Sequence, residues 1–531
     1  MVLKDKTQNF LFVFGFFFLL IMYVFIQNYF CSLRYSSDGK TYKANLEKHL
    51  KKFKSTEEYE NQFRDKSKPH IYINFWHNLY KDEEELFIQI IEGFQKKYPQ
   101  IKIVLSNKEN WGQILKNVSN ALNVNKQPNL VFSYPDHIEF YSKSNKLIPL
   151  NIFTKKEKEL KEENPSFTNL LDIEKHFKEG YIPTHNFGDG EKYYYLPLLK
   201  THEIMFYNKN KIKEFKDEIE KEFKEEFEEE EIIDLKTGEI KTQLTWDQMK
   251  KICRIMKEKK GQNFIPILVD SEDNLFIISL EQNKNDKINY PSETNSLEKF
   301  FQDSGTQDRI SYFKENFGQR EKEYLTFSKL SGEYVIPKLM KDDNICFYIT
   351  STRRLENLCD IKNSDITWIP KREGDEDKNI LQGPNVNLFF SEDNDKNLAS
   401  WFFLKYLSSF ETYKKLLREG KMYDNIYKVE NEEEEKKDIN EILDSELESP
   451  DKKGTFKRQF QKLIRTNLNK KLEDAKQHQK DYFFTSPIFQ NSNYLRTVMT
   501  DLILKIFSME SYDKTKIGEL FEDAYKRLIT I

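Results

Sequence analysis

Cysteine is scarce in this sequence, and the spacing of the cysteines indicates neither a disulfide framework nor a metal site. Four cysteines occur in 531 residues, without a CxxC pair, so disulfides are not what holds this chain together. Cys346 and Cys359 stand in apolar or helical contexts, which favours packed thiols over ligands. The eight histidines are scattered. Only His70, His77 and His137 come near to forming a cluster, and we expect neither a metal nor a cofactor.

The motifs of common catalytic and nucleotide-binding sites are also missing. No strand is followed by GxGxxG, and the chain has no GxxxxGK[ST], HExxH or GxSxG segment. The sequence therefore carries no signal for a dinucleotide site, a triphosphate loop, a zinc protease or a serine hydrolase. Its 88 acidic residues are too many for any one carboxylate pair to identify a glycosidase.

Neither sign of charge is in large excess. The 84 basic and 88 acidic residues leave a net charge of −4, which provides no general attraction for nucleic acid. Apolar residues make up 38% of the chain, below the roughly 45–50% of an average globular protein. The 43 Phe and 28 Tyr nevertheless supply large rings for a core. A chain of this length accommodates two or more domains.

One long apolar run, Phe10–Ile26, interrupts this polar sequence close to its start. Its length is at the lower limit for a helix that spans a membrane. We therefore expect residues 1–30 to be a membrane anchor that is not cleaved, and the rest of the chain to be a water-soluble body held at a membrane.

Two other interpretations of this N-terminal segment stay open. A cleaved secretory signal requires small side chains before the cut, whereas residues 28–30 are bulky. Lipidation at Cys31 would likewise require small side chains before the cysteine, and they are missing here. The polar residues that follow, 31–69, are rich in Lys and Glu and predict a stalk or surface helix.

Strand-like and helix-like segments alternate after residue 69. Short β-branched and aromatic runs predict strands, and apolar residues at helical spacing predict helices. The predicted order is a strand at 70–76, a helix at 83–98, a strand at 101–105, a helix from Trp111 and a strand at 129–135. Such alternation indicates parallel βαβ units, whose ligands lie beyond the carboxyl ends of the strands. Those ends are residues 76–78 and 133–137.

The same pattern resumes in the second half of the chain. Residues 244–259 predict an amphipathic helix with Thr245 as its N-cap. Further strands are predicted at 264–269, 344–350, 366–370 and 385–390, and an apolar helix at 397–409. Two α/β bodies fit this pattern better than one.

Two strongly charged segments resemble insertions. Residues 213–231 predict a charged helix in which Phe215, Ile219, Phe223 and Phe227 recur every four positions, so we expect a solvated insertion over 213–240. A helix that binds a partner is the alternative. The acidic run at 430–438 predicts a surface or disordered segment.

Several short motifs, taken in their order, resemble the family-1 extracellular solute-binding proteins of ABC importers, in particular the maltose- and glycerol-3-phosphate-binding group. The resemblance covers roughly residues 70–530. It is carried by Trp76-His77 after the first strand, YPDH at 134–137, YYYLPLLKTHEIMFYNK from Tyr193, LTWDQMKKICRIMKE from Leu244, NICFYITSTRRL from Asn344, LQGPNVNLFF from Leu381 and LASWFFLKYLSS from Leu398. The most specific part is the Pro–x(10)–Tyr-Asn-Lys segment beside the Thr-Trp-Asp helix start.

The resemblance implies an α/β fold of two periplasmic-binding-protein-like lobes with a hinge, in addition to the N-terminal membrane helix. Lobe 1 is expected to comprise 70–202 and 384–430, and lobe 2 to comprise 203–383 and 431–531. The polar patch Lys200–Glu203 would lie at the hinge and face the cleft between the lobes. An ordinary buried strand pair with a turn at Lys200 is the alternative.

By the same resemblance, thirteen residues are expected to contact the ligand. They are Trp76, His77, Tyr134, Asp136, His137, Lys200, His202, Ser351, Thr352, Arg353, Asn385, Tyr494 and Arg496. Each has a structural alternative: Trp76 is also consistent with a core residue, Tyr134 and Tyr494 with packing, and Arg353 with a surface charge.

The implied function is capture of a carbohydrate or a glycerol-3-phosphate-like solute outside the cell, and its delivery to the permease subunits of an ABC transporter. The arginines of the segment STRR favour an anionic ligand. We expect a binding protein rather than an enzyme, a monomer, and no nucleic-acid partner. A membrane-anchored glycoside-processing enzyme and a surface interaction protein that uses the charged insertion are the alternatives.

Overall fold

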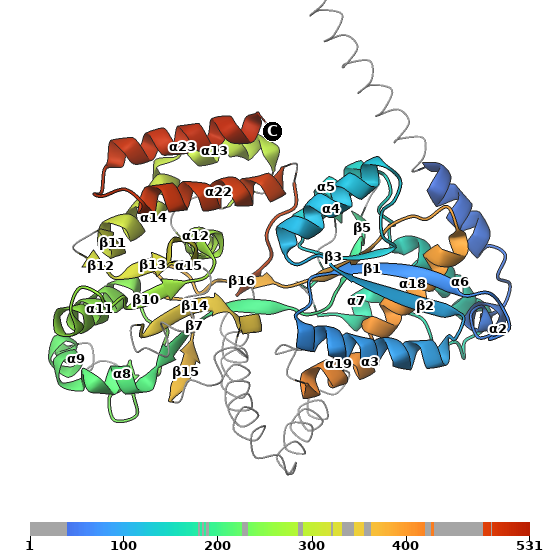
Figure 1. Cartoon of the computed structure of the whole chain (residues 1–531), viewed down its shortest axis with the longest axis horizontal. Helices are drawn as coiled ribbons and strands as arrows, with labels where there is room; N and C mark the ends of the chain where they lie inside the picture. Colours follow the sequence, from blue (N-terminus) through green and yellow to red (C-terminus); the bar gives the residue numbers. More distant parts are fainter. Residues whose placement is uncertain are drawn as a thin grey trace, which may run out of the picture.

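The chain folds into two lobes that lie side by side (Figure 1). The computed structural model describes residues 40–178, 181–182, 185–186, 191–225, 232–284, 290–291, 293–319, 322–331, 345–354, 363–419, 426–428, 482–489 and 491–530. The apolar run at 10–26, Cys31, Cys359 and the acidic run at 430–438 lie outside these residues. Within the described part, no helix combines the length and the apolar character needed to cross a bilayer.

Lobe 1 is built on a five-stranded sheet in the order β2-β1-β3-β17-β6. The strands are β1 Ile71–His77, β2 Ile101–Asn107, β3 Leu130–Ser133, β6 Tyr195–Pro197 and β17 Asn385–Leu388. The first three are parallel, as predicted, whereas β17 runs antiparallel to both β3 and β6. The helices of this lobe are α2 Thr56–Asn61, α3 Lys81–Lys97, α4 Trp111–Asn123, α5 His137–Lys143, α6 Asn151–Glu163, α7 Ile173–His176, α18 Asn394–Leu407 and α19 Phe410–Arg418. A two-stranded ribbon of β4 His185–Asn186 and β5 Glu191–Lys192 lies apart from the sheet.

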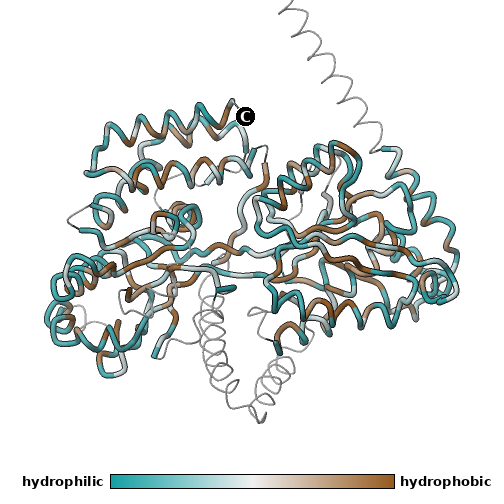
Figure 2. Tube along the Cα trace, viewed as in Figure 1, coloured by the Kyte–Doolittle hydropathy of each residue, from teal (hydrophilic) through white to brown (hydrophobic). Residues whose placement is uncertain are grey.

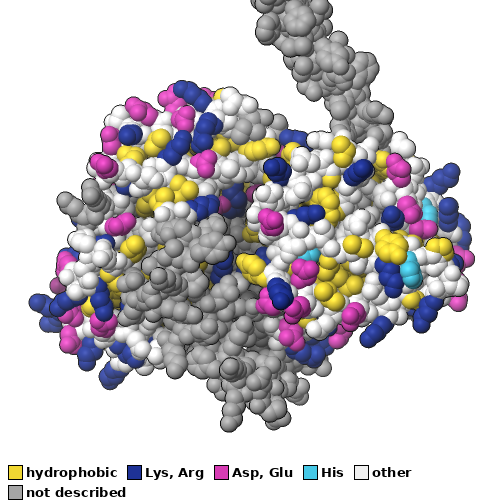
Figure 3. Space-filling view, in the orientation of Figure 1, with side chains coloured by type: hydrophobic (Ala, Val, Ile, Leu, Met, Phe, Trp, Pro, Cys, Tyr) yellow, Lys and Arg dark blue, Asp and Glu magenta, His cyan; other side chains and the backbone are white. Residues whose placement is uncertain are grey.

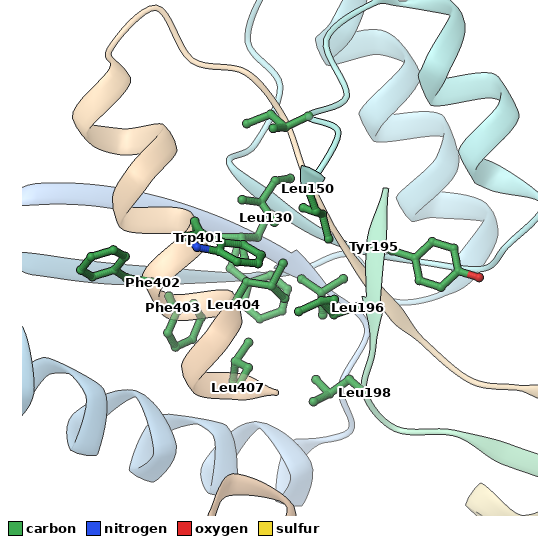
Figure 4. Close-up of a cluster of buried hydrophobic side chains, with 14 of the residues drawn as sticks. Leu130, Leu150, Tyr195, Leu196, Leu198, Trp401, Phe402, Phe403, Leu404 and Leu407 are labelled. Carbon is green, nitrogen blue, oxygen red and sulfur yellow. The ribbon is translucent and has the colours of Figure 1, made fainter. Parts of the chain in front are cut away.

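The core of lobe 1 is dominated by large rings and aliphatic side chains. Trp401 and Leu404 of α18 are fully buried and lie against Leu196 of β6 (Figure 4). Trp401 also stacks on Phe153 of α6, with ring centroids 5.1 Å apart. The helix predicted at 397–409 is therefore confirmed as α18, and burial of residues 397–404 explains why this part of the sequence is rich in apolar side chains.

Residues 40–69 correct one expectation, because they pack on lobe 1 instead of forming a polar stalk. Leu46, Leu50, Tyr59 and Phe63 are buried in the core of this lobe. The Tyr59 hydroxyl donates a 2.9 Å hydrogen bond to the buried carboxylate of Glu157. Most of the many Lys and Glu side chains of this segment are exposed, while its apolar residues recur at helical spacing and face the core. The high charge made this apolar pattern hard to recognise in the sequence.

Lobe 2 is built on a longer sheet in the order β13-β10-β14-β7-β16-β18, with β15 also paired to β7. Its strands are β7 Thr201–Asn208, β10 Ile267–Val269, β13 Leu325–Phe327, β14 Phe347–Ser351, β15 Ser364–Thr367, β16 Asn379–Gln382 and β18 Phe483–Phe484. Strand β10 is parallel to β13 and β14, while β7 is antiparallel to β14, β15 and β16. Both lobes therefore contain the predicted parallel units, and each has an apolar interior in Figure 2.

The helices of lobe 2 cover its sheet and extend beyond it. They are α8 Lys209–Glu214, α9 Lys216–Glu222, α11 Trp246–Lys260, α12 Glu272–Glu281, α13 Leu297–Gln302, α14 Ser304–Phe317, α15 Ser328–Ser331, α22 Ser492–Phe507 and α23 Lys514–Ile529, with 3₁₀ turns η1 Thr294–Ser296 and η2 Thr352–Arg354. Two short ribbons pair β8 Ile233–Asp234 with β9 Glu239–Ile240 and β11 Gly318–Gln319 with β12 Lys322–Glu323. Helix α11 begins as predicted, because the Thr245 hydroxyl accepts a hydrogen bond from the Gln248 amide and the Gln248 side chain accepts one from the Thr245 amide.

The charged segment that starts at residue 213 is part of lobe 2 and not a separate solvated helix. Phe215, Ile219 and Phe223 are buried in the core of this lobe, and Phe215 separates two short helices, α8 and α9. Three residues of the apolar stripe that suggested a partner are thus covered by the chain itself, and the fourth, Phe227, lies outside the described residues. Figure 3 shows both signs of charge interspersed over the visible face, consistent with the near-balanced composition.

Two short segments carry the chain between the sheets. Residues 198–200 connect β6 of lobe 1 to β7 of lobe 2, and Gly383 and Pro384 connect β16 back to β17. The two segments touch, since the Leu198 amide donates to the Pro384 carbonyl at 3.2 Å. Gly383 has φ +93°, and a Cβ there would lie 2.1 Å from the Leu199 carbonyl oxygen. Only glycine fits this crossing.

Candidate functional site

A cavity of about 790 Å³ opens between the lobes, beside the two crossings. Lobe 1 contributes Asn78, Tyr80, Glu109, Asn110, Trp111 and Tyr134 to its wall. Lobe 2 contributes Thr201 and Glu203 of β7, Gln382 of β16, and residues at or after the ends of β10, β13 and β14, while the second crossing contributes Gly383 and Pro384. Its volume falls within the range of small-molecule sites, and its position matches the expected carboxyl ends of parallel strands.

Two stacked rings form the aromatic part of the wall. Trp111 and Tyr134 have centroids 4.1 Å apart and planes inclined by 30°. Trp111 is the first residue of α4, which the Asn110 side chain caps by accepting from the Gln113 amide at 3.0 Å. Tyr134 follows β3 directly and was predicted to line the cleft. In the sequence analysis Trp111 served only to mark the start of a helix. It follows the end of β2 and the N-cap residue Asn110, and this position is the signal that would have identified it as a residue of the cavity wall.

Within the polar patch Lys200–Glu203, the residues that line the cavity are not the predicted Lys200 and His202 but Thr201 and Glu203. Successive residues of a strand point to opposite faces. Because β7 begins at Thr201, the side chains of Thr201 and Glu203 line the cavity, while His202 points away, with its ring 4.3 Å from that of Phe483. The expected cleft contacts of Lys200 and His202 are therefore not observed.

Lys200 and Asn385 bind each other instead of lining the cavity. The Lys200 ammonium donates to the Asn385 Oδ1 at 2.7 Å, and both side chains are buried. Burial lowers the pKa of Lys200 to about 7. This pair joins the first crossing to the start of β17 and is a structural feature of the hinge.

Arg353 reaches from lobe 2 across to lobe 1. Its Nε lies 3.0 Å from Glu83 Oε1 and its Nη2 lies 2.5 Å from Glu83 Oε2, which makes a two-pronged ion pair. Nη2 also donates to the Asn78 carbonyl at 3.2 Å, and the guanidinium lies 4.5 Å from the ring centre of Tyr80. Arg353 and the neighbouring Ser351 line the cavity, whereas Thr352 is buried beneath it and accepts from the His202 amide at 3.2 Å.

Arg496 on α22 forms a second bridge between the lobes. Its Nε lies 3.3 Å from the carboxylate of Asp136 in lobe 1, and its Nη1 pairs with Asp273 in lobe 2. The same guanidinium donates to Asn274 and to Ser486, each at 2.7 Å. Arg496 does not line the cavity, and Tyr494 packs on the core of lobe 2.

The remaining predicted residues lie behind the cavity wall. Trp76 is half-buried on β1, with the Lys108 ammonium 4.3 Å from its ring centre. His77 is fully buried and accepts from the Leu79 amide at 3.2 Å, and burial lowers its pKa to about 4. His137 is buried at the start of α5. Within the described residues, no three His, Cys, Asp or Glu side chains are grouped as a metal site requires.

The cations of the cavity wall all have acidic partners. Arg353 is paired with Glu83, Arg354 with Asp270 at 3.2 Å, and Lys329 with Glu272 at 3.2 Å. Among the described residues, no basic group lies within ion-pair distance of either Glu109 or Glu203. The arginines that favoured an anionic ligand are thus already neutralised.

Comparison with known proteins agrees with this geometry. A family model described as "Bacterial extracellular solute-binding protein" matches residues 89–438. Similar solved structures include the GacH receptor of Streptomyces glaucescens, determined unliganded and with acarbose (15% identity, TM-score 0.56, 87% of this chain and 99% of that chain). They also include an ABC substrate-binding protein from Listeria monocytogenes in complex with cycloalternan (13%, 0.60, 87% and 98%). A third is UgpB from Mycobacterium tuberculosis in complex with glycerophosphocholine (10%, 0.59, 87% and 98%). None of the curated protein sequences compared with this chain matches it significantly.

Proposed function

This chain belongs to the bacterial extracellular solute-binding proteins, and we propose that it captures a carbohydrate between its lobes and presents it to the permease subunits of an ABC importer. The observation that carries this proposal is the interlobe cavity with the stacked pair Trp111–Tyr134 in its wall. A sugar ring has apolar faces that pack on aromatic rings and hydroxyls that need polar partners. Two of the similar structures hold such ligands, acarbose and cycloalternan.

A neutral solute suits this wall better than glycerol 3-phosphate does. A phosphate requires free guanidinium or ammonium groups, or the amides at a helix N-terminus. Arg353, Arg354 and Lys329 each have a carboxylate partner, so a phosphate would have to displace one of these carboxylates. The carboxylate of Glu109, which also lines the wall, would repel it as well.

Closure of the lobes would follow from the contacts that the solute makes with both of them. A ligand shifts a conformational equilibrium only by its differential affinity for the two states. Trp111 and Tyr134 belong to lobe 1, and Thr201 and Ser351 belong to lobe 2, so a solute that touches residues of both lobes favours the closed arrangement. The body would sit on the outer face of the cell membrane as a monomer, held there by residues 10–26.

A thermal-shift screen tests the proposed function. A ligand that binds only the folded state raises the unfolding temperature. We expect neutral oligosaccharides to raise it and to be recovered unchanged after incubation. Glycerol 3-phosphate and glycerophosphocholine are the comparison ligands. Shortened oligosaccharides in the recovered sample would instead support a glycoside-processing enzyme, and stabilisation by the phosphates alone would contradict a carbohydrate ligand.

A further inference from the structure

Glu203 is a buried acidic residue in the cavity wall with one carboxyl oxygen unused. Its side chain is 2% exposed, and Oε1 accepts a hydrogen bond from the Asn274 amide at 2.7 Å. Its other oxygen, Oε2, has no hydrogen-bond partner among the described residues. A buried polar atom without a partner is costly, and where it faces a cavity a ligand supplies the missing bond.

The surroundings of Glu203 hold the carboxyl group in place. The Asn274 side chain is itself fixed by Gln382 at 2.6 Å and by Arg496 at 2.7 Å. The main-chain carbonyl of Glu203 accepts from the Asn379 amide at 2.8 Å. With Oε1 and the backbone both fixed, Oε2 is the unpartnered atom of a residue that lines the cavity, and it lies just beneath the cavity surface, where a small shift of the wall would bring it to a solute.

Charge around this carboxyl group disfavours an anion at Oε2. Burial raises the pKa of Glu203 to about 8, Asp270 and Asp273 add to this increase, and the hydrogen bond from Asn274 and the buried Arg496 oppose it. Arg496 is already shared between Asp136 and Asp273. A carboxyl group with this pKa is largely protonated at neutral pH, so a neutral hydroxyl fits here as donor or acceptor, an ammonium requires the ionised carboxylate, and the two aspartates disfavour a phosphate.

We propose that Glu203 selects the solute by a hydrogen bond between its free oxygen and a hydroxyl or ammonium group, and that it excludes solutes with a phosphate at this position. The inference rests on the proposed function, since it places the solute in the interlobe cavity. It adds the residue that determines specificity, which sequence reasoning did not select. Thr201, two residues before it on the same face of β7, lines the wall beside it.

Binding measurements with three probes on the full chain and two variants of Glu203 test this proposal. The probes are maltotriose with hydroxyl groups, chitosan trisaccharide with ammonium groups, and glycerol 3-phosphate. Glu203→Met removes hydrogen bonding at similar volume, while Glu203→Gln keeps the acceptor for Asn274 and turns an amide donor towards the solute. The control is Glu281→Gln, which changes a part-buried carboxyl group at the end of α12 outside the cavity.

We expect Glu203→Met to weaken binding of a saccharide about tenfold or more, the loss typical of one buried hydrogen bond to a polar or charged group. Glu281→Gln, which lies outside the cavity, should change it by less than about threefold. A solute bound through ammonium should lose affinity in Glu203→Gln too, whereas a hydroxyl can reverse its hydrogen bond and retain most of its affinity. Unfolding temperatures of both Glu203 variants verify that they are folded.

Three results overturn the proposal. Saccharide binding that is unchanged in a folded Glu203→Met variant refutes the role of Glu203 and leaves the proposed function intact. Tighter binding of glycerol 3-phosphate than of either saccharide refutes the selection against phosphate. Failure of the unaltered chain to bind either saccharide refutes the proposed function and this inference together.

Discussion

The guanidinium of Arg353 in lobe 2 donates hydrogen bonds to both carboxylate oxygens of Glu83 in lobe 1, at 3.0 Å and 2.5 Å. Arg353 belongs to lobe 2, immediately after β14, and Glu83 lies in the first turn of α3 in lobe 1. The pair sits at the edge of the cavity, where any opening of the lobes must break it. It therefore holds the lobes together beside the place where the solute would enter.

Replacing Glu83 with Gln should shift the lobes towards an open arrangement. Removing one partner of a buried ion pair leaves an uncompensated charge that costs about 3–5 kcal/mol. Separation of the lobes relieves that cost, because Arg353 then becomes hydrated. Small-angle X-ray scattering without solute should show a larger radius of gyration for Glu83→Gln. The matched control is Asp308→Asn, whose partner Arg372 lies in the same lobe at 3.1 Å; equal scattering from Glu83→Gln and the unaltered chain would refute the bridge.

The crossing at Gly383 should not tolerate a side chain. A Cβ at this position would lie 2.1 Å from the Leu199 carbonyl oxygen of the other crossing, and the left-handed backbone adds about 1–2 kcal/mol for any other residue. Gly374 has φ +79° but nothing within 4 Å of its Cβ position. Gly374→Ala therefore measures the cost of the left-handed backbone without a steric clash. Gly383→Ala should therefore lower the free energy of unfolding in urea clearly more than Gly374→Ala, and equal losses would contradict the close packing of the crossings.

Acid should destabilise lobe 1 through His77. Burial lowers the pKa of this histidine from about 6.5 to about 4 in the folded state. Between those two values the unfolded chain binds a proton that the folded chain does not, so stability falls as pH falls through this range. His77→Asn keeps an acceptor for the Leu79 amide and does not titrate. The loss of unfolding free energy between pH 7 and pH 4.5 should be smaller in the variant by about 2 kcal/mol, and parallel pH profiles would contradict this assignment.

Local patterns in the sequence predicted much of the fold. The strands and helices of residues 70–135 and the N-cap at Thr245 depend on apolar spacing and capping, which are properties of adjacent residues. Residues 40–69 were misjudged because charge density hid the apolar face that includes Leu46 and Leu50. Likewise, the apolar stripe that includes Ile219 was ascribed to an insertion, although it is buried in lobe 2.

The candidate site was less predictable, because its geometry depends on register and on distant partners. A shift of one residue along β7 decides whether His202 or Glu203 faces the cavity, and no local pattern fixes that shift. The acidic partners of Arg353 and Arg496 lie more than 200 positions away in the sequence. Tyr134, Ser351 and Arg353 nevertheless line the cavity, since each lies at or just after the end of a predicted strand, and their contact with a ligand stays a prediction.

Isothermal titration of the protein with a neutral oligosaccharide tests the central claim, that the interlobe cavity binds a sugar, most directly. Trp111→Ala removes one ring of the stacked pair, and Trp76→Ala removes a half-buried tryptophan of the same lobe that lies outside the cavity. We expect one sugar bound per chain, with affinity at least about tenfold lower in Trp111→Ala and little changed in Trp76→Ala. Binding that survives intact in Trp111→Ala, or that is lost equally in both variants, would contradict the account.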